Sequence, residues 1–219
     1  MAETEDIERI ASHIQVNTQS SIRIEADGKV LYSDPFKIPK AVNDADVIFL
    51  THDHYDHFSP EDIRKVMKAE SVFVAPEKMA GQVSKFVSSD DRMIRVLPGM
   101  KTDVAGIPVE TVPAFNLAKP FHPKKNGWTG YVVTVDGVRI YLAGDTDATK
   151  EAAAVRCDIA MVPIGGTFTM DARQAAKLVN EIRPWVAIPI HYGSIVGRRE
   201  DADVFRKYVE PEIKIVMKL

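Results

Sequence analysis

The chain has 219 residues, of which 45% are hydrophobic and 27% charged, and its formal net charge is −3. These values are typical of a globular protein, and the lack of a basic block argues against nucleic acid or anionic membranes as partners. The single cysteine, Cys157, excludes a disulfide framework and a thiolate zinc site. Because the N-terminus is acidic and no long apolar run is present, we expect a cytoplasmic protein.

The first third of the sequence is rich in predicted strands. Short strands are expected over residues 13–16, 21–24 and 29–32, and Asp27-Gly28 is a strong signal for a two-residue hairpin turn. The apolar run from Val47 to Leu50 predicts a buried strand. Ser59 and Pro60 suit the N-cap and first position of the next helix. We expect this helix over residues 60–69, a strand at 71–75, a helix at 76–87, and strands at 93–97 and 107–112.

The second half of the sequence repeats this style. Strands at 129–135 and 138–142 flank Asp136-Gly137, which is a second hairpin signal. Helices are then predicted at 148–155, 171–182 and 201–208, and strands at 158–163, 186–190 and 213–217. No stretch resembles a linker, so we expect one domain over residues 1–219. Hairpins followed by strand–helix alternation, in two similar halves, predict two mixed β-sheets packed together with helices outside.

Three histidines and two aspartates are concentrated in the run from His52 to His57, directly after a predicted buried strand. Neutral imidazole is the commonest metal-binding side chain, and a strand end holds ligands in a fixed geometry. His52 and His54 are two residues apart, so in an extended loop they point the same way and can share one metal. Asp56 and His57 are adjacent and diverge, which suits a second metal nearby.

Three further candidate ligands lie far along the chain. Asp145 and His191 each follow a predicted strand, and His122 lies in the loop after residues 107–112. Functional groups of α/β folds are commonly placed directly after buried strands. A carboxylate such as Asp145 is suited to bridging two metals. His13 is interpreted as a structural or surface residue.

The motif His52-x-His54-x-Asp56-His57 resembles the signature of the metallo-β-lactamase superfamily. Weaker motifs support this resemblance over almost the full length: Asp34-Pro35-Phe36, residues 143–147, residues 163–167 with 169–171, and residues 189–193. They are similar to the branch of small metal-dependent hydrolases that includes the ascorbate-6-phosphate lactonase-like proteins. The resemblance implies an α/β (α+β) fold, a four-layer αββα sandwich of two mixed β-sheets with a dinuclear site at one edge.

The resemblance also implies a set of metal ligands: His52 and His54 on the first metal, Asp56, His57 and His191 on the second, and Asp145 bridging. Many members supply a third histidine to the first metal at the position where this chain has Asn116. An amide oxygen is a poor zinc ligand beside imidazole. We therefore expect the loop to fold back so that His122 supplies the ligand. The alternative is a depleted first site, with one metal bound tightly and one weakly.

These observations predict a metal-dependent hydrolase that uses a metal-bound hydroxide to cleave a small, soluble, anionic ester, lactone or phosphodiester. Asp56 and Asp145 are the expected catalytic carboxylates. Two zinc ions are expected, and manganese or iron(II) also suits the ligands. One alternative is a metal-binding protein with little catalysis, which Asn116 favours, and another is a nucleic-acid phosphodiesterase, which the acidic balance disfavours. A homo-oligomer is compatible with the sequence.

Several other residues lie close to these motifs in the sequence. Asp34 is expected to accept a hydrogen bond from a ligand histidine, and Thr51 and Thr146 are candidates for similar roles. Four residues are near enough to line the pocket but are interpreted as surface or packing residues: Lys119, Lys124, Trp128 and Tyr192.

Overall fold

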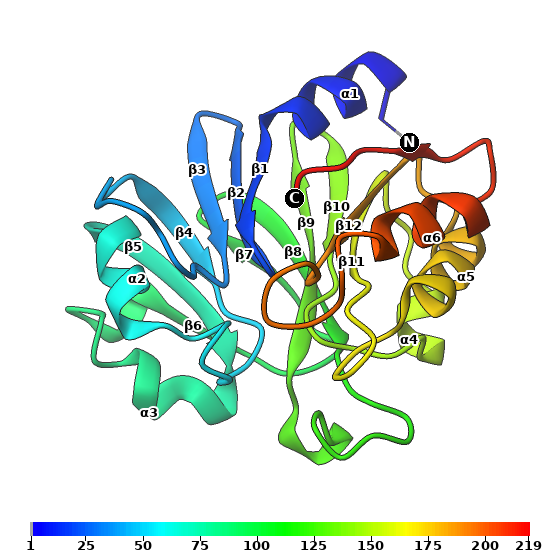
Figure 1. Ribbon diagram of the computed structural model, residues 1–219. Coiled ribbons are helices and arrows are strands. Elements are labelled where there is room, and N and C mark those ends of the chain that lie inside the picture. Colours follow the sequence, from blue (N-terminus) through cyan, green and yellow to red (C-terminus); the bar gives the residue numbers. More distant parts are fainter. Residues whose placement is uncertain (1) are drawn as a thin grey trace.

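Two β-sheets pack face to face in the computed structural model, which describes residues 2–219 (Figure 1). The first sheet has the order β1-β2-β3-β4-β5-β6 and comprises β1 Ile14–Thr18, β2 Ser21–Ala26, β3 Lys29–Ser33, β4 Ala45–Phe49, β5 Met67–Pro76 and β6 Met93–Val96. The second has the order β13-β12-β11-β10-β9-β8-β7 and comprises β7 Lys101–Val104, β8 Ile107–Pro113, β9 Thr129–Val135, β10 Val138–Leu142, β11 Ile159–Pro163, β12 Val186–Ile190 and β13 Lys214–Ile215. The predicted pair of mixed sheets is confirmed.

Both sheets combine antiparallel hairpins with parallel strands. β1, β2 and β3 pair antiparallel, whereas β3 to β6 pair parallel. In the second sheet, β7 to β10 are antiparallel and β10 to β13 are parallel. The two predicted hairpin turns form at Asp27-Gly28 and Asp136-Gly137, where all four residues have positive φ angles between 47° and 77°. Positive φ at both positions is the geometry that asparagine, aspartate and glycine favour in two-residue hairpins.

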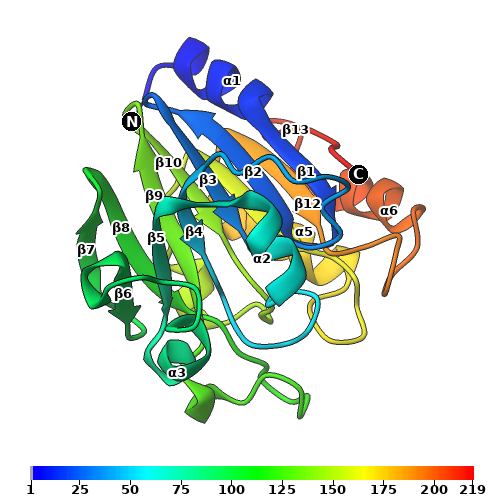
Figure 2. The same ribbon diagram turned by 90° about the vertical axis from the view of Figure 1, so that its left-hand side faces the viewer.

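Helices cover both outer faces, so the sandwich has four layers. On the first sheet lie α2 Pro60–Val66 and α3 Ala80–Val83, with α2 in front of the strands in Figure 2. On the second sheet lie α4 Lys150–Ala153, α5 Ala172–Ile182 and α6 Asp201–Tyr208. Residues of β4 alternate between the layers: Val47 and Phe49 lie in the core between the sheets, whereas Ile48 packs under the helices. Burial on both faces explains the continuous apolar run.

An N-terminal helix, α1 Thr4–His13, was not predicted. Ile7, Ile10 and Ala11 lie on one side of it and are buried in the core between the sheets. The helix lies across the end of the sandwich at the top of Figure 1. It leads into the start of β1, whereas the His191 N–H bonds the Gln19 carbonyl just after the other end of β1. His13 ends α1 instead of opening a strand, and it is exposed, in agreement with a surface role.

Several predicted boundaries were wrong. The helix expected over 60–69 ends at Val66 because Met67 already pairs with Ala45 in β4. The helix expected over 76–87 is reduced to the 3-10 turn Glu77–Met79 followed by the short α3, in which Gly81 is a poor helix former. The helix expected over 148–155 spans only the four residues of α4. β7 was missed, and β13 has two residues instead of five.

Two predicted helix caps are present. Ser59 accepts a hydrogen bond from the Asp62 backbone N–H, and Pro60 occupies the start of α2. Asp171 and Gln174 form a reciprocal capping box at the start of α5. Among residues 2–219, no helix is long and apolar enough to cross a membrane.

Candidate metal centre

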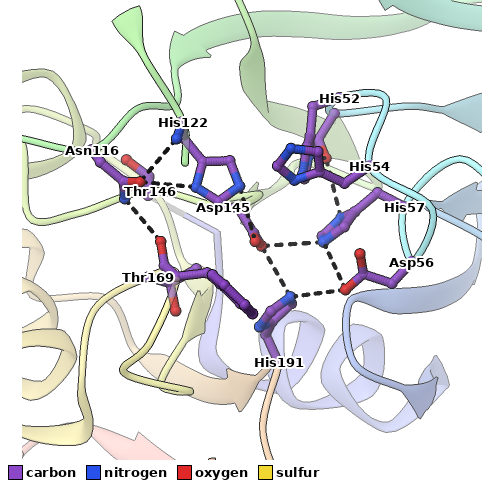
Figure 3. A network of polar contacts seen from close by, with 12 residues as sticks. His52, His54, Asp56, His57, Asn116, His122, Asp145, Thr146, Thr169 and His191 are labelled. Carbon is purple, nitrogen blue, oxygen red and sulfur yellow. Dashed lines mark hydrogen bonds and ion pairs between the residues drawn. The ribbon is translucent and has the colours of Figure 1, made fainter. Parts of the chain in front are cut away.

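Seven side chains from separate parts of the chain converge at one edge of the sandwich (Figure 3). The segment that follows β4 carries four of them, and the other three come from the β8–β9 connection, the loop after β10 and the end of β12. The structure thus brings together every residue that the sequence predicted for the site: His52, His54, Asp56, His57, His122, Asp145 and His191. They form three overlapping groups whose ligand atoms lie within 4.8 Å of one another.

The first group consists of His52, His54 and His122. His52 Nε2 lies 3.1 Å from His54 Nδ1, so both nitrogens face the same point. His122 Nε2 lies 3.3 Å from Asp145 Oδ2, on the side of this group that faces the centre of the site. Three imidazole nitrogens in this arrangement could hold one metal ion.

The second group consists of Asp56, His57 and His191. Asp56 Oδ2 is 3.7 Å from His57 Nε2 and 3.4 Å from His191 Nε2. Asp145 Oδ1 lies 3.3 Å from each of the same two nitrogens. Since its other oxygen faces His122, the Asp145 carboxylate lies between the two groups, as a bridging ligand would.

Four atoms at the centre of the site are buried without a hydrogen-bond partner among the described residues. They are His57 Nε2, His122 Nε2, His191 Nε2 and Asp145 Oδ1. Buried polar atoms are nearly always satisfied, and leaving one unpaired costs about 1–3 kcal/mol. Because these atoms face one another and are nitrogen and oxygen donors, bound cations such as zinc, manganese or iron(II) would satisfy them together. The donor set therefore fits a metal centre.

Asp34 and Thr51 set the orientation of two ligand histidines. Asp34 is fully buried, and its Oδ2 lies 2.7 Å from His57 Nδ1 and accepts the Thr51 hydroxyl proton at 2.6 Å. Thr51 Oγ1, having donated its proton, accepts from His52 Nδ1 at 2.9 Å. Both rings thus carry a proton on Nδ1, and each ring turns its Nε2 toward the site. Asp34 and Thr51 have the roles expected for them, whereas Thr146 instead bonds the backbone of Phe115.

Asn116 supports His122. Its Oδ1 accepts hydrogen bonds from the backbone N–H and from Nδ1 of His122, both at 3.0 Å. Its Nδ2 donates to Asp147 Oδ1 at 3.2 Å and to the Phe168 carbonyl at 2.9 Å, which fixes the orientation of the amide. The backbone N–H of Asn116 also bonds the His122 carbonyl, so the loop folds back as expected. This supporting role was not foreseen from the sequence.

Burial and neighbouring charges shift the pKa values of the ligand side chains in different directions. Burial lowers the pKa of His52 well below its usual value, and it also lowers the pKa of His54. Burial likewise opposes a charge on His57, but the Asp145 and Asp34 carboxylates outweigh it and raise the pKa of His57 well above its usual value. Burial tends to raise the pKa of Asp145, yet His191 and His57 hold it well below the usual range. The Asp145 carboxylate at the centre is therefore held in its charged form, which favours a bound cation.

His191 is held in a strained backbone conformation. Its φ angle is +57°, which is uncommon for a residue other than glycine, and its N–H donates to the Gln19 carbonyl at 3.0 Å. Gly165 allows the close approach, because a Cβ at this position would lie 2.4 Å from the His191 carbonyl oxygen. Strained residues persist where their surroundings fix them, commonly at functional sites.

A cavity of about 660 Å³ opens onto the ligands His54, Asp56 and Asp145. Its other lining residues are Tyr55, Phe121, Thr167, Phe168, Ile195, Val196 and Gly197. The four residues that lie near the motifs in sequence are not part of the described lining. Trp128 packs behind the rings of His52 and His54, Lys119 bonds Asp147, Lys124 bonds Glu151, and Tyr192 is buried.

Comparison with known proteins shows to which family this chain belongs. Residues 13–191 match the family described as the Beta-lactamase superfamily domain. The chain belongs to the metallo-β-lactamase superfamily. This superfamily member is 31% identical to a UPF0173 metal-dependent hydrolase of Aeropyrum pernix, over 87% of this chain and 86% of the relative. It is 32% identical to the UPF0173 metal-dependent hydrolase TK0141 of Thermococcus kodakarensis, over 89% and 90% of the two chains.

Two solved structures of metal-dependent hydrolases have the same fold. A candidate metal-dependent hydrolase of Parabacteroides distasonis matches with a TM-score of 0.80 and 27% identity, over 94% of this chain and 92% of that one. Igni18, a metallo hydrolase of Ignicoccus hospitalis, matches with a TM-score of 0.74 and 22% identity, over 93% of both chains. The present member is thus a metal-dependent hydrolase of the UPF0173 family.

Proposed function

We propose that this protein hydrolyses a small soluble ester, lactone or phosphodiester with the help of two metal ions, zinc being the expected metal. The observation that carries the proposal is the set of unpaired buried ligand atoms, of which Asp145 also lines a cavity of about 660 Å³. In this proposal His52, His54 and His122 hold one ion, Asp56, His57 and His191 hold the other, and Asp145 bridges them.

Metal ions bound there would lower the pKa of a coordinated water toward ~7 and polarise the group that is cleaved. Asp56 lines the cavity, so its carboxylate can orient the attacking water and pass a proton to the leaving group. Asp145 places one oxygen toward each ligand group and fixes their separation. Asp34, Thr51 and Asn116 keep the imidazole rings in the required orientation.

The remaining expectations from the sequence belong to this proposal. Negative charge on the group that is cleaved, as in a phosphodiester, would be met by the metal ions. A lactone is one candidate, by similarity of the motifs to the ascorbate-6-phosphate lactonase-like branch. We also propose a cytoplasmic location and no role for nucleic acid, and a homo-oligomer is compatible with the proposal.

Metal counting and an activity panel test the proposal. The protein loaded with zinc, manganese or iron(II) is assayed against lactones, esters and phosphodiesters, and we expect two ions per chain and turnover of one class. His122→Ala should lower the stoichiometry or weaken one ion, whereas His13→Ala removes an exposed histidine outside the site and should change neither. Two ions without turnover on any class would instead support a metal-binding protein with little catalysis. Unchanged stoichiometry and affinity in His122→Ala would refute the ligand assignment.

A further inference from the structure

We infer that the cavity beside the metal centre accepts an apolar substituent of the substrate, an alkyl or aryl group next to the bond that is cleaved. This inference rests on the proposed function, because it assigns a substrate class to the same site. The lining of the cavity combines two kinds of residue: three of the ligands, and a set that is mostly aromatic and aliphatic.

The apolar residues of the lining come from four separate loops. Tyr55 comes from the loop after β4, Phe121 from the β8–β9 connection and Phe168 from the loop after β11, while Ile195 and Val196 follow β12. Phe121 and Phe168 pack edge to face with their ring centres 4.7 Å apart. Together these five residues are called the apolar wall below.

Parts of the apolar wall are open to solvent at the mouth of the cavity. Tyr55 is 65% exposed and Phe121 is 40% exposed, although both are large aromatic residues. Covering apolar surface is favourable in proportion to the area removed from water. An apolar group that lies on this wall, with its reactive group at the ligands, would gain this free energy.

The charges around the cavity disfavour an anionic substituent at the wall. Within residues 2–219, the lining of the cavity contains no lysine or arginine, and its two ionisable carboxylates are Asp56 and Asp145. Lys119 is close in sequence to Phe121, but its ammonium group bonds Asp147 Oδ1 and the Thr169 carbonyl. A negative group on the apolar wall would lose hydration without gaining a cationic partner.

The wall is fixed to the metal centre by the hydrogen bonds of Asn116. The Phe168 carbonyl accepts from Asn116 Nδ2, and the residue after Phe121 is His122, whose N–H and ring bond Asn116 Oδ1. The two aromatic residues are therefore held in place before a substrate arrives, which lowers the entropic cost of binding. A volume of about 660 Å³ is in the range of small-molecule sites, so the cavity has room for a substituent of several carbon atoms.

Two hydroxamates that differ only in their tails test the inference without requiring turnover. Hexanohydroxamic acid and succinic monohydroxamic acid offer the same chelating group to the metals, but one tail is apolar and the other is anionic. We expect zinc-loaded protein to bind the apolar compound at least about tenfold more tightly in calorimetry. Phe168→Ala should reduce this preference severalfold, and Ile195→Lys should shift it toward the anionic compound. Leu97→Ala, which alters an exposed apolar residue outside the cavity, should leave it unchanged.

The outcomes separate this inference from the proposed function. The inference of an apolar substituent would be overturned if the two compounds bound equally, if the anionic one bound more tightly, or if neither bound to the zinc-loaded protein. A preference that persists at full strength in Phe168→Ala would also overturn it, since the apolar wall would not be its cause. A clear apolar preference in a protein that turns over no ester, lactone or phosphodiester would leave the inference standing and refute the proposed hydrolysis.

Discussion

Replacing Asn116 by alanine should weaken the first metal site selectively. The substitution removes two hydrogen bonds accepted from His122 and two donated to Asp147 and the Phe168 carbonyl. The His122 ring then loses the partner that keeps its proton on Nδ1. The loss of such a supporting group costs about 10–100-fold in metal affinity. Two buried N–H groups of His122 also lose their partner, so the metal-free protein should lose about 2–4 kcal/mol of unfolding free energy.

Zinc titration in competition with a fluorescent chelator measures both affinities, and urea unfolding measures stability. Asn180→Ala is the matched control, because Asn180 also bonds two backbone groups, the Tyr208 carbonyl and the Glu210 N–H, away from the site. It should lower stability and leave both metal affinities unchanged. If Asn116→Ala binds the first zinc as tightly as Asn180→Ala does, Asn116 does not position His122 and the reasoning fails.

Three further changes test other parts of the structure. Gly165→Ala places a Cβ against the His191 carbonyl, so it should weaken binding of the second metal and lower the melting temperature. Gly81→Ala is the control: its Cβ meets no atom within 4 Å, and it should raise the free energy of unfolding by about 0.5–1 kcal/mol. Equal effects of the two substitutions would contradict the close approach at Gly165. Asp34→Ala should weaken metal binding about 10–100-fold in the chelator assay, since His57 loses its carboxylate, and unaltered binding would speak against this support. Although burial opposes its charge, Asp62 has a pKa below the usual value because Ser59, Lys65 and two backbone N–H groups bond it. The folded pKa is lower than the unfolded one, so its contribution of about 1–3 kcal/mol is present above pH ~4 and is lost progressively as the pH falls from there through the folded pKa. The difference in urea unfolding between wild type and Asp62→Asn should therefore be largest at pH 7 and shrink as the pH falls below ~4, and a constant difference would refute this linkage.

Local signals in the sequence were sufficient to predict much of the fold and about half of the metal-ligand residues. The run from His52 to His57 is contiguous and follows a strand whose burial on both faces leaves an unbroken apolar stretch. The turns at Asp27-Gly28 and Asp136-Gly137 require a backbone that few other residue pairs adopt easily. These features depend on neighbours in the chain, so a pattern can reveal them.

Other features depend on tertiary contacts. β7 has only Val104 buried, so its sequence lacks the alternation that predicts a strand. The apolar face of α1 was present in the sequence, but its burial depends on where the two sheets meet. Asn116 supports His122 through a loop that folds back on Asp147, and no local pattern encodes that contact. The apolar wall likewise exists only after several loops meet.

The division of the ligands between the two sheets has a mechanical consequence. The segment after β4 belongs to the first sheet, whereas His122, Asp145 and His191 come from connections of the second. In the proposed assignment each ion takes ligands from both sheets, so bound metal would act as a tether across one edge of the sandwich. Helix α1 lies across the opposite end, packed into the core between the sheets. Metal removal would therefore break this tether at one edge, while the core between the sheets and α1 still hold the sandwich together.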